Sequence, residues 1–289
     1  MHVAKDELAR DNSVRIINID RPGFGGSTEV DASDRVRAWL EIVPALLEHL
    51  GIPYVSVVCH SGGLIYALNT VLHLRHLLHP TRPYVAICAP WIHPSHSGVS
   101  LLHLATALPE SVLYRFDIVA RFFTKAELFT GSSTLFLGDD SGRDWEDQLR
   151  PDLVNRVFSE NVRGLNQEAM LLLKRTPKPD CWGSWVDIDG FVPLLDIVER
   201  SHPGPPLQIE VFYAESDIMV GTSNGPTWFD NCWKKRASDM HFSSCVVPGT
   251  DHDRILDIKH GVFGQILRTV ACSESISRQK DGPDGATKV

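Results

Sequence analysis

The sequence contains no block of basic residues and no excess of positive charge. Its 289 residues include 28 Lys and Arg against 36 Asp and Glu, which gives a net charge of −8 at pH 7. Nucleic acids and anionic membrane surfaces are bound by clustered Lys and Arg side chains. The composition therefore argues against a nucleic-acid partner.

Cysteine is scarce, and no two cysteines form a CxxC pair. The six lie far apart along the chain, at Cys59, Cys88, Cys181, Cys232, Cys245 and Cys272. Zinc sites and disulfide frameworks show characteristic close or regular cysteine spacings, and none is present here. We expect no metal, no disulfide framework and no cofactor.

The sequence also has little that could act as a signal peptide or a membrane span. Lys5, Asp6 and Glu7 make the N-terminus polar. The most apolar helix-like run, Gly63–Leu78, is interrupted by several polar residues, Asn69 among them. A transmembrane helix needs about 20 predominantly apolar residues. We expect a cytoplasmic or other intracellular protein.

What is present is an alternation of strand-like and helix-like segments. Short apolar runs rich in β-branched residues predict strands, and apolar residues at helical spacing predict helices between them. The predicted strands are Val14–Ile19, Tyr54–Val58, Tyr84–Ala89, Leu207–Tyr213 and Phe242–Val247, and the principal helices are Ala32–Leu50, the Gly63–Leu78 run and Asp253–Val270. This order predicts an α/β fold with a parallel sheet.

The strand rhythm stops for about 100 residues in the middle of the chain. That stretch shows helical patterns, such as Ser111–Phe123 and Leu165–Lys174, and no convincing strand. We therefore predict a discontinuous core of residues 1–96 and 201–272, with residues 97–200 as a helical insertion that could form a lid. Residues 273–289 are rich in Ser, Lys, Asp and Gly and predict a disordered tail.

Ser61 follows the second predicted strand and precedes Gly62 and Gly63. Glycines allow a sharp strand-to-helix turn that would lift the serine hydroxyl off the sheet, and the N–H of Gly62 would lie at a helix N-terminus, suited to stabilising an oxyanion. An ordinary glycine-rich turn with a helix-capping serine is the simpler alternative. A reactive serine also needs a base, and the base an acid.

Candidate partners follow the last two predicted strands. Asp217 comes after Leu207–Tyr213, and His252 comes after Phe242–Val247. The carboxyl ends of parallel strands lie at one edge of a sheet, where ligand sites form. The chain order Ser, Asp, His predicts a nucleophile, an acid and a base, with Glu215 as the rival acid.

With these residues in place, the chain resembles the α/β-hydrolase superfamily over about residues 6 to 270. Asp20–Ser27 resembles the loop after that family's fourth strand, and Cys59–Gly63 resembles its G-x-S-x-G nucleophile elbow. The segments of Asp217 and His252 resemble its acid and base loops, and Leu101–Arg200 resembles its helical cap. The resemblance implies a serine hydrolase.

Two departures from the family pattern stand out. Cys59 replaces the first glycine of the elbow and could itself be a rival nucleophile. The family's first three strands, and the His-Gly loop that donates a second oxyanion N–H, are missing. We interpret this as an N-terminal truncation, and expect it to leave Val14–Ile19 without its usual neighbour or paired directly with Tyr54–Val58, and to impair activity.

The predicted function is cleavage of an ester or related acyl bond of a small molecule. Ser61 is the predicted nucleophile, His252 the base, Asp217 the residue that orients it, and Gly62 N–H the oxyanion donor. Alternatives are a catalytically impaired or non-catalytic ligand-binding protein, and an acyltransferase or carbon–carbon bond hydrolase with the same three residues. His60 is open between lining the pocket and a structural role.

Overall fold

The computed structural model describes residues 2–99, 106, 109, 145–160, 163–177, 181–234 and 240–280. Within them, one sheet is formed by β1 (Val57–Ser61), β2 (Tyr84–Pro90), β3 (Leu207–Ala214) and β4 (Met240–Val247). The strands lie in the order β1-β2-β3-β4 and every pairing is parallel. This arrangement confirms the predicted α/β fold.

One face of the sheet carries the larger hydrophobic core. It is covered by α2 (Arg35–His49), α3 (Gly63–His73), α10 (Ile188–Ser201) and α11 (Asn224–Lys234). Helix α3 is buried from Leu64 to Leu72, as expected for a helix that other elements enclose on several sides. The helix that follows Ser61 is therefore firmly anchored.

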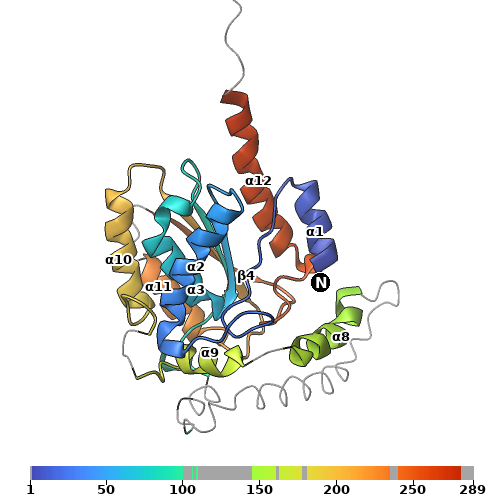
Figure 1. Cartoon of the computed structure of the whole chain (residues 1–289), viewed down its shortest axis with the longest axis vertical. Coiled ribbons are helices and arrows are strands. Elements are labelled where there is room, and N and C mark those ends of the chain that lie inside the picture. The colour runs from blue at the N-terminus through green and yellow to red at the C-terminus, as the bar shows by residue number, and fades with distance from the viewer. Residues whose placement is uncertain are drawn as a thin grey trace, which may run out of the picture.

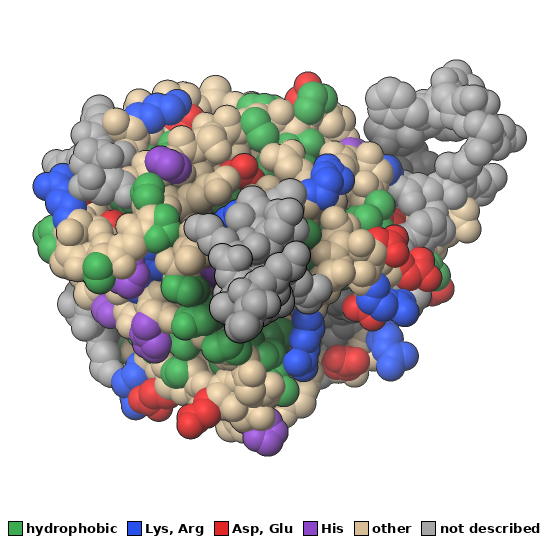
Figure 2. Space-filling view, turned by 90° about the horizontal axis from the view of Figure 1, so that it is seen from above, with side chains coloured by type: hydrophobic (Ala, Val, Ile, Leu, Met, Phe, Trp, Pro, Cys, Tyr) green, Lys and Arg blue, Asp and Glu red, His purple; other side chains and the backbone are tan. Residues whose placement is uncertain are grey.

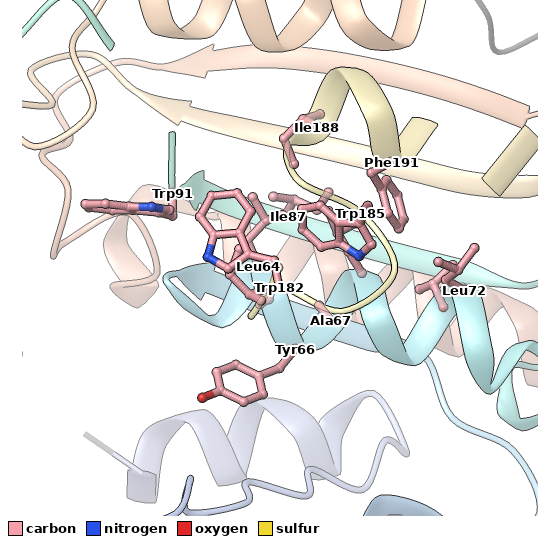
Figure 3. Packing of buried hydrophobic residues seen from close by; sticks show 14 of the residues in the cluster. Leu64, Tyr66, Ala67, Leu72, Ile87, Trp91, Trp182, Trp185, Ile188 and Phe191 are labelled. Carbon is pink, nitrogen blue, oxygen red and sulfur yellow. The ribbon is translucent and has the colours of Figure 1, made fainter. Parts of the chain in front are cut away.

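Aromatic side chains fill much of this core. Trp182 and Trp185 come from the segment before α10, and Phe191 comes from the helix itself. Figure 3 shows Trp182 beside Leu64 of α3, with Trp185 and Phe191 following toward the Leu72 end of the helix. The rings of Trp182 and Trp185 meet edge-on with centroids 5.4 Å apart. Trp182, Trp185 and Phe191 are all buried within this core.

The opposite face carries a smaller core. Ala86 and Cys88 of β2 pack there with Val262 and Ile266 of α12 (Val262–Lys280). Helix α1 (His2–Asp11) lies beside α12 (Figure 1), and the ammonium of Lys5 is 5.5 Å from the ring centre of Phe263. Helices on both faces bury the parallel sheet, as such sheets require.

The predicted helical insertion is described only in part. Its described helices are α8 (Trp145–Ser159), α9 (Gly164–Leu172) and α10, and α4 (Pro94–Ser97) ends at its first residue. The predicted helix Ser111–Phe123 lies outside the described residues. Toward the end of the chain, α12 continues to Lys280, past the predicted start of the disordered tail at Ser273, and residues 281–289 lie outside the described part.

The prediction of a strand at Val14–Ile19 is wrong. These residues carry no strand assignment, and among the described residues no strand pairs with the outer edge of β1. A strand needs a hydrogen-bonded neighbour, so apolar, β-branched composition alone does not produce one. In particular, Val14–Ile19 does not pair with the strand predicted at Tyr54–Val58.

Two other boundaries differ from the sequence prediction. The strand expected at Tyr54–Val58 begins only at Val57, and Val55 forms a single bridge with Leu78. The helix expected at Asp253–Val270 begins at Val262, after a short 3₁₀ turn. Gly261 has φ +76°, a left-handed conformation that interrupts a helix, so the apolar pattern begins before the helix does.

Charged side chains of both signs lie on the face of the molecule seen in Figure 2. Figure 2 shows Lys and Arg interspersed with Asp and Glu on the face in view, with hydrophobic side chains between them. In the described part of the chain, no helix is long and apolar enough to cross a membrane.

Candidate active site

Ser61 ends strand β1 in an unusual backbone conformation. Its φ is +52°, a region that costs a non-glycine residue free energy and that clusters at functional sites. Gly62 follows as the N-cap of α3. The first N–H groups of a helix have no partner within it, so they are available to an oxygen placed above them.

Leu172 of α9 packs against this turn. A Cβ atom added to Gly62 would lie only 2.8 Å from Cδ1 of Leu172. A side chain at position 62 would therefore push the end of the Leu172 side chain aside, so the two residues are closely packed. Trp91 makes a second link, because its backbone N–H donates to the carbonyl of Ser61 at 3.2 Å and its Nε1 donates to the carbonyl of Leu172 at 3.3 Å.

His252 lies within hydrogen-bond distance of both other candidate residues. Its Nε2 is 2.8 Å from Oγ of Ser61, and its Nδ1 is 2.7 Å from Oδ2 of Asp217. His252 is 7% exposed and Asp217 3% exposed. Water therefore competes little for these contacts, which strengthens them.

Asp217 is held in place by its own loop. Its Oδ1 accepts hydrogen bonds from the backbone N–H groups of Met219 at 2.8 Å and Val220 at 2.9 Å. Because Oδ1 is occupied, Oδ2 is left for His252. A carboxylate only accepts, so Nδ1 of His252 carries the hydrogen and Nε2 presents its lone pair to the hydroxyl of Ser61.

The rival acid, Glu215, serves a different contact. It is exposed, and its Oε2 accepts from the backbone N–H of Gly249 at 2.9 Å. Ser216, between the two acids, donates to the carbonyl of Thr250 from both its N–H and its hydroxyl, each at 3.0 Å. These contacts join the loop after β3 to the loop after β4 and place Asp217, not Glu215, against His252.

The rival nucleophile, Cys59, is buried in the core under α3. Burial raises the pKa of its thiol to about 12. The thiolate is the nucleophilic form of cysteine, and a thiol with so high a pKa is almost entirely protonated near neutral pH. The location and the pKa of Cys59 both argue against a role as nucleophile.

A buried ionic cluster joins α9 to the core beside this site, and sequence analysis missed it. Glu168 of α9 accepts from Arg35 of α2 at 2.6 Å, from Arg21 at 2.8 Å and from the hydroxyl of Tyr66 of α3 at 2.5 Å. Arg35 and Glu168 are both buried, so each charge would be strongly destabilising without the other to compensate it. Leu172 lies four positions after Glu168, about one helical turn along α9, so the cluster anchors the turn of the helix that reaches Gly62.

His60 makes a hydrogen bond that sequence analysis did not predict. Its Nε2 is 2.7 Å from the backbone carbonyl of His252. Nothing in the sequence marks such a contact, because the two histidines are 192 residues apart. No group of three or more His, Cys, Asp or Glu side chains suited to a metal ion occurs in the part of the chain that the structure describes.

The parallel sheet, the strained serine turn and the clustered Asp and His define an α/β protein with a candidate hydrolase site. A model of the alpha/beta hydrolase family matches residues 2–257, and the chain belongs to this family. A comparison with curated proteins found no match.

Solved structures of similar fold are distant in sequence. A bromoperoxidase from Bacillus anthracis has a TM-score of 0.58 at 13% identity, with 92% of this chain and 85% of that chain covered. A structure from a study of carboxylesterases of Nitrososphaera gargenis gives 0.55 at 13%, covering 94% and 85%. An esterase from Exiguobacterium antarcticum gives 0.54 at 12%, covering 93% and 87%. At these identities the similarity establishes the fold.

Proposed function

We propose that this member of the family is a serine hydrolase that cleaves an ester or related acyl bond of a small molecule. The observation that carries the proposal is the unbroken chain of hydrogen bonds from Asp217 through His252 to Ser61. These are the residue types, in the geometry, that activate a serine hydroxyl.

In the proposed reaction, Oγ of Ser61 attacks the acyl carbonyl while Nε2 of His252 takes the hydroxyl proton. Asp217 holds the required tautomer and stabilises the imidazolium that forms. The tetrahedral intermediate collapses when His252 returns the proton to the leaving alcohol. Water then attacks the acyl-enzyme by the same steps, which releases the acid and restores Ser61.

The N–H of Gly62 is the proposed donor to the oxyanion. Its place at the N-terminus of α3 supports this role, because the helix dipole and the unpaired N–H groups there favour negative charge. We also propose that residues 97–200 form a cap over the site. The contact of Leu172 with Gly62 supports this, since it brings α9 against the nucleophile turn.

Ester hydrolysis tests the proposal directly. We expect the full chain to hydrolyse short-chain aryl esters and Ser61→Ala to lower kcat by at least about 10⁴-fold, as loss of the nucleophile does in related chemistry. Ser184→Ala is the matched control, because Ser184 also faces a histidine ring, Nε2 of His73, but on the surface and at 3.4 Å. Ester turnover that survives Ser61→Ala would refute the proposal.

A further inference from the structure

The proposed nucleophile and base come from opposite edges of the sheet. Ser61 ends β1 and His252 follows β4, with β2 and β3 between them. Three strand spacings of about 4.8 Å separate the two edge strands by about 14 Å. The pairing of the strands alone therefore does not place the imidazole against Ser61, and the loop after β4 must reach back across the sheet.

His60 supplies a direct link between these two edges. It precedes Ser61 on β1, and its Nε2 contacts the main-chain oxygen of His252 at 2.7 Å. A carbonyl oxygen can only accept, so Nε2 of His60 must carry the hydrogen. The two imidazole rings lie 5.0 Å apart, inclined by 52°.

This link completes the support of His252. Asp217 holds the ring at Nδ1, and His60 holds the backbone carbonyl of the same residue. Without the hydrogen bond from His60, the loop after β4 could shift while the imidazole of His252 kept its hydrogen bond to Asp217. The distance between Nε2 of His252 and Oγ of Ser61 would then no longer be fixed.

A neutral imidazole at His60 fits its position beside His252. Burial lowers the pKa of its imidazole, and repulsion from His252 lowers it further, while the His252 carbonyl, Asp253 and Asp217 act in the opposite direction. A neutral His60 with its hydrogen on Nε2 donates to the carbonyl without repelling the imidazolium that the proposed reaction creates on His252.

We propose that His60 is a positioning residue, whose hydrogen bond to the main chain of His252 sets the distance between the proposed base and Ser61. The inference rests on the proposed hydrolase function. It assigns His60 no contact with substrate and no proton transfer in the reaction.

The test compares three variants of the full chain. The amide N–H of Gln can replace the donor at Nε2 of His60. The amide of Asn lies at the position of Nδ1, too far back to reach the carbonyl of His252. Leu has no donor. We expect His60→Leu and His60→Asn to lower kcat about 10- to 100-fold, the effect of a lost buried hydrogen bond, with KM within about twofold. His60→Gln should keep kcat within about threefold of wild type, because the hydrogen bond is retained.

Rates are expressed per active site, counted by stoichiometric labelling with a fluorophosphonate, so that loss of folded protein does not mimic loss of rate. Wild-type kcat per labelled site in His60→Asn would overturn the proposal, even if His60→Leu failed to fold. Equal losses in His60→Gln and His60→Leu would also overturn it. Failure of the hydrolase function itself would be recognised separately, by absence of labelling and turnover in the wild-type chain.

Discussion

Asp217 has a separate partner for each of its carboxylate oxygens. Oδ1 fixes the loop through the N–H groups of Met219 and Val220, and Oδ2 meets Nδ1 of His252. The first oxygen needs only to accept these two bonds, whereas the second also determines which nitrogen of His252 carries the hydrogen. A substitution can therefore keep the loop and lose the tautomer.

Asp217→Asn should do this. Its amide oxygen can keep the bonds to Met219 and Val220, which directs the NH₂ group toward His252. Nδ1 must then accept, the hydrogen moves to Nε2, and His252 loses the lone pair that faces Ser61. We expect kcat for aryl esters to fall by about 10⁴-fold, as in the equivalent serine-protease change, with little loss of thermal stability.

Glu215→Gln is the control for this prediction, because it makes the same chemical change two residues away on an exposed side chain. It should leave kcat near the wild-type value. A large loss of kcat in Glu215→Gln, with activity kept in Asp217→Asn, would transfer the orienting role to Glu215.

His93 should make stability depend on pH. Burial, and next the charge of Lys174, lower its pKa from the ordinary 6.5 to about 4. Between these two values the unfolded chain binds more protons at this residue than the folded chain does. Its contribution to stability is therefore complete above pH 6.5 and is lost as the pH falls toward 4.

His93→Asn removes this titration and keeps an acceptor for the N–H of Ser95 at the start of α4. Urea unfolding at pH 7, 5.5 and 4.5 measures the effect. The wild-type midpoint should fall more steeply with acidification than the midpoint of the variant. Parallel curves for the two proteins would contradict the assignment.

At the scale of elements, helix α9 depends on one buried charge. Glu168 joins it to Arg35, Arg21 and Tyr66, which lie on three other segments. Removing one partner of a buried ion pair leaves the other charge without compensation. The attachment of α9, and with it the position of Leu172 beside Gly62, should therefore be sensitive to a single neutral substitution.

Glu168→Gln should lower the free energy of unfolding by about 3 kcal/mol, because the guanidinium of Arg35 stays buried without a negative partner. Urea unfolding measures this loss. Glu41→Gln, a control on the exposed face of α2, should change stability by less than about 0.5 kcal/mol. Equal effects of the two substitutions would show that the cluster contributes no more than a surface ion pair.

Elements with local signals could be predicted from the sequence. The strand Leu207–Tyr213 and the helix Ala32–Leu50 carry apolar patterns that match their burial. Ser61, Asp217 and His252 were predicted to lie near one another because each follows a parallel strand at the same edge of the sheet, and their side chains do lie within hydrogen-bond distance. Val14–Ile19 could not be placed by pattern, because a strand depends on a neighbour that its own residues do not specify.

The long-range polar contacts lay beyond sequence reasoning for a related physical reason. The bond from His60 to His252 and the cluster around Glu168 form between segments more than 100 residues apart. A lone histidine or glutamate has no periodicity, so its partner becomes apparent only when the fold brings the segments together.

At the scale of the whole molecule, the sheet has an edge at β1. Val58 is 42% exposed on that strand, and no described strand covers its outer side. An open edge with an apolar side chain is a template for pairing with another chain. We expect self-association of the protein to proceed in part through β1.

Val58→Glu should slow aggregation at 37 °C, measured by light scattering, because a charge on an edge strand opposes strand addition. Val186→Glu adds the same charge at an exposed position outside any strand. It controls for the general effect of net charge. If both substitutions slow aggregation equally, the edge of β1 has no special part in it.

The proposed function depends above all on Ser61 as the nucleophile of an acyl-cleaving site. The most direct measurement is mass-spectrometric mapping of the residue modified when the full chain reacts with a fluorophosphonate. We expect one adduct per chain, on Ser61, absent in Ser61→Ala and strongly slowed in Asp217→Asn. An adduct on another residue, or labelling that persists in Ser61→Ala, would contradict it.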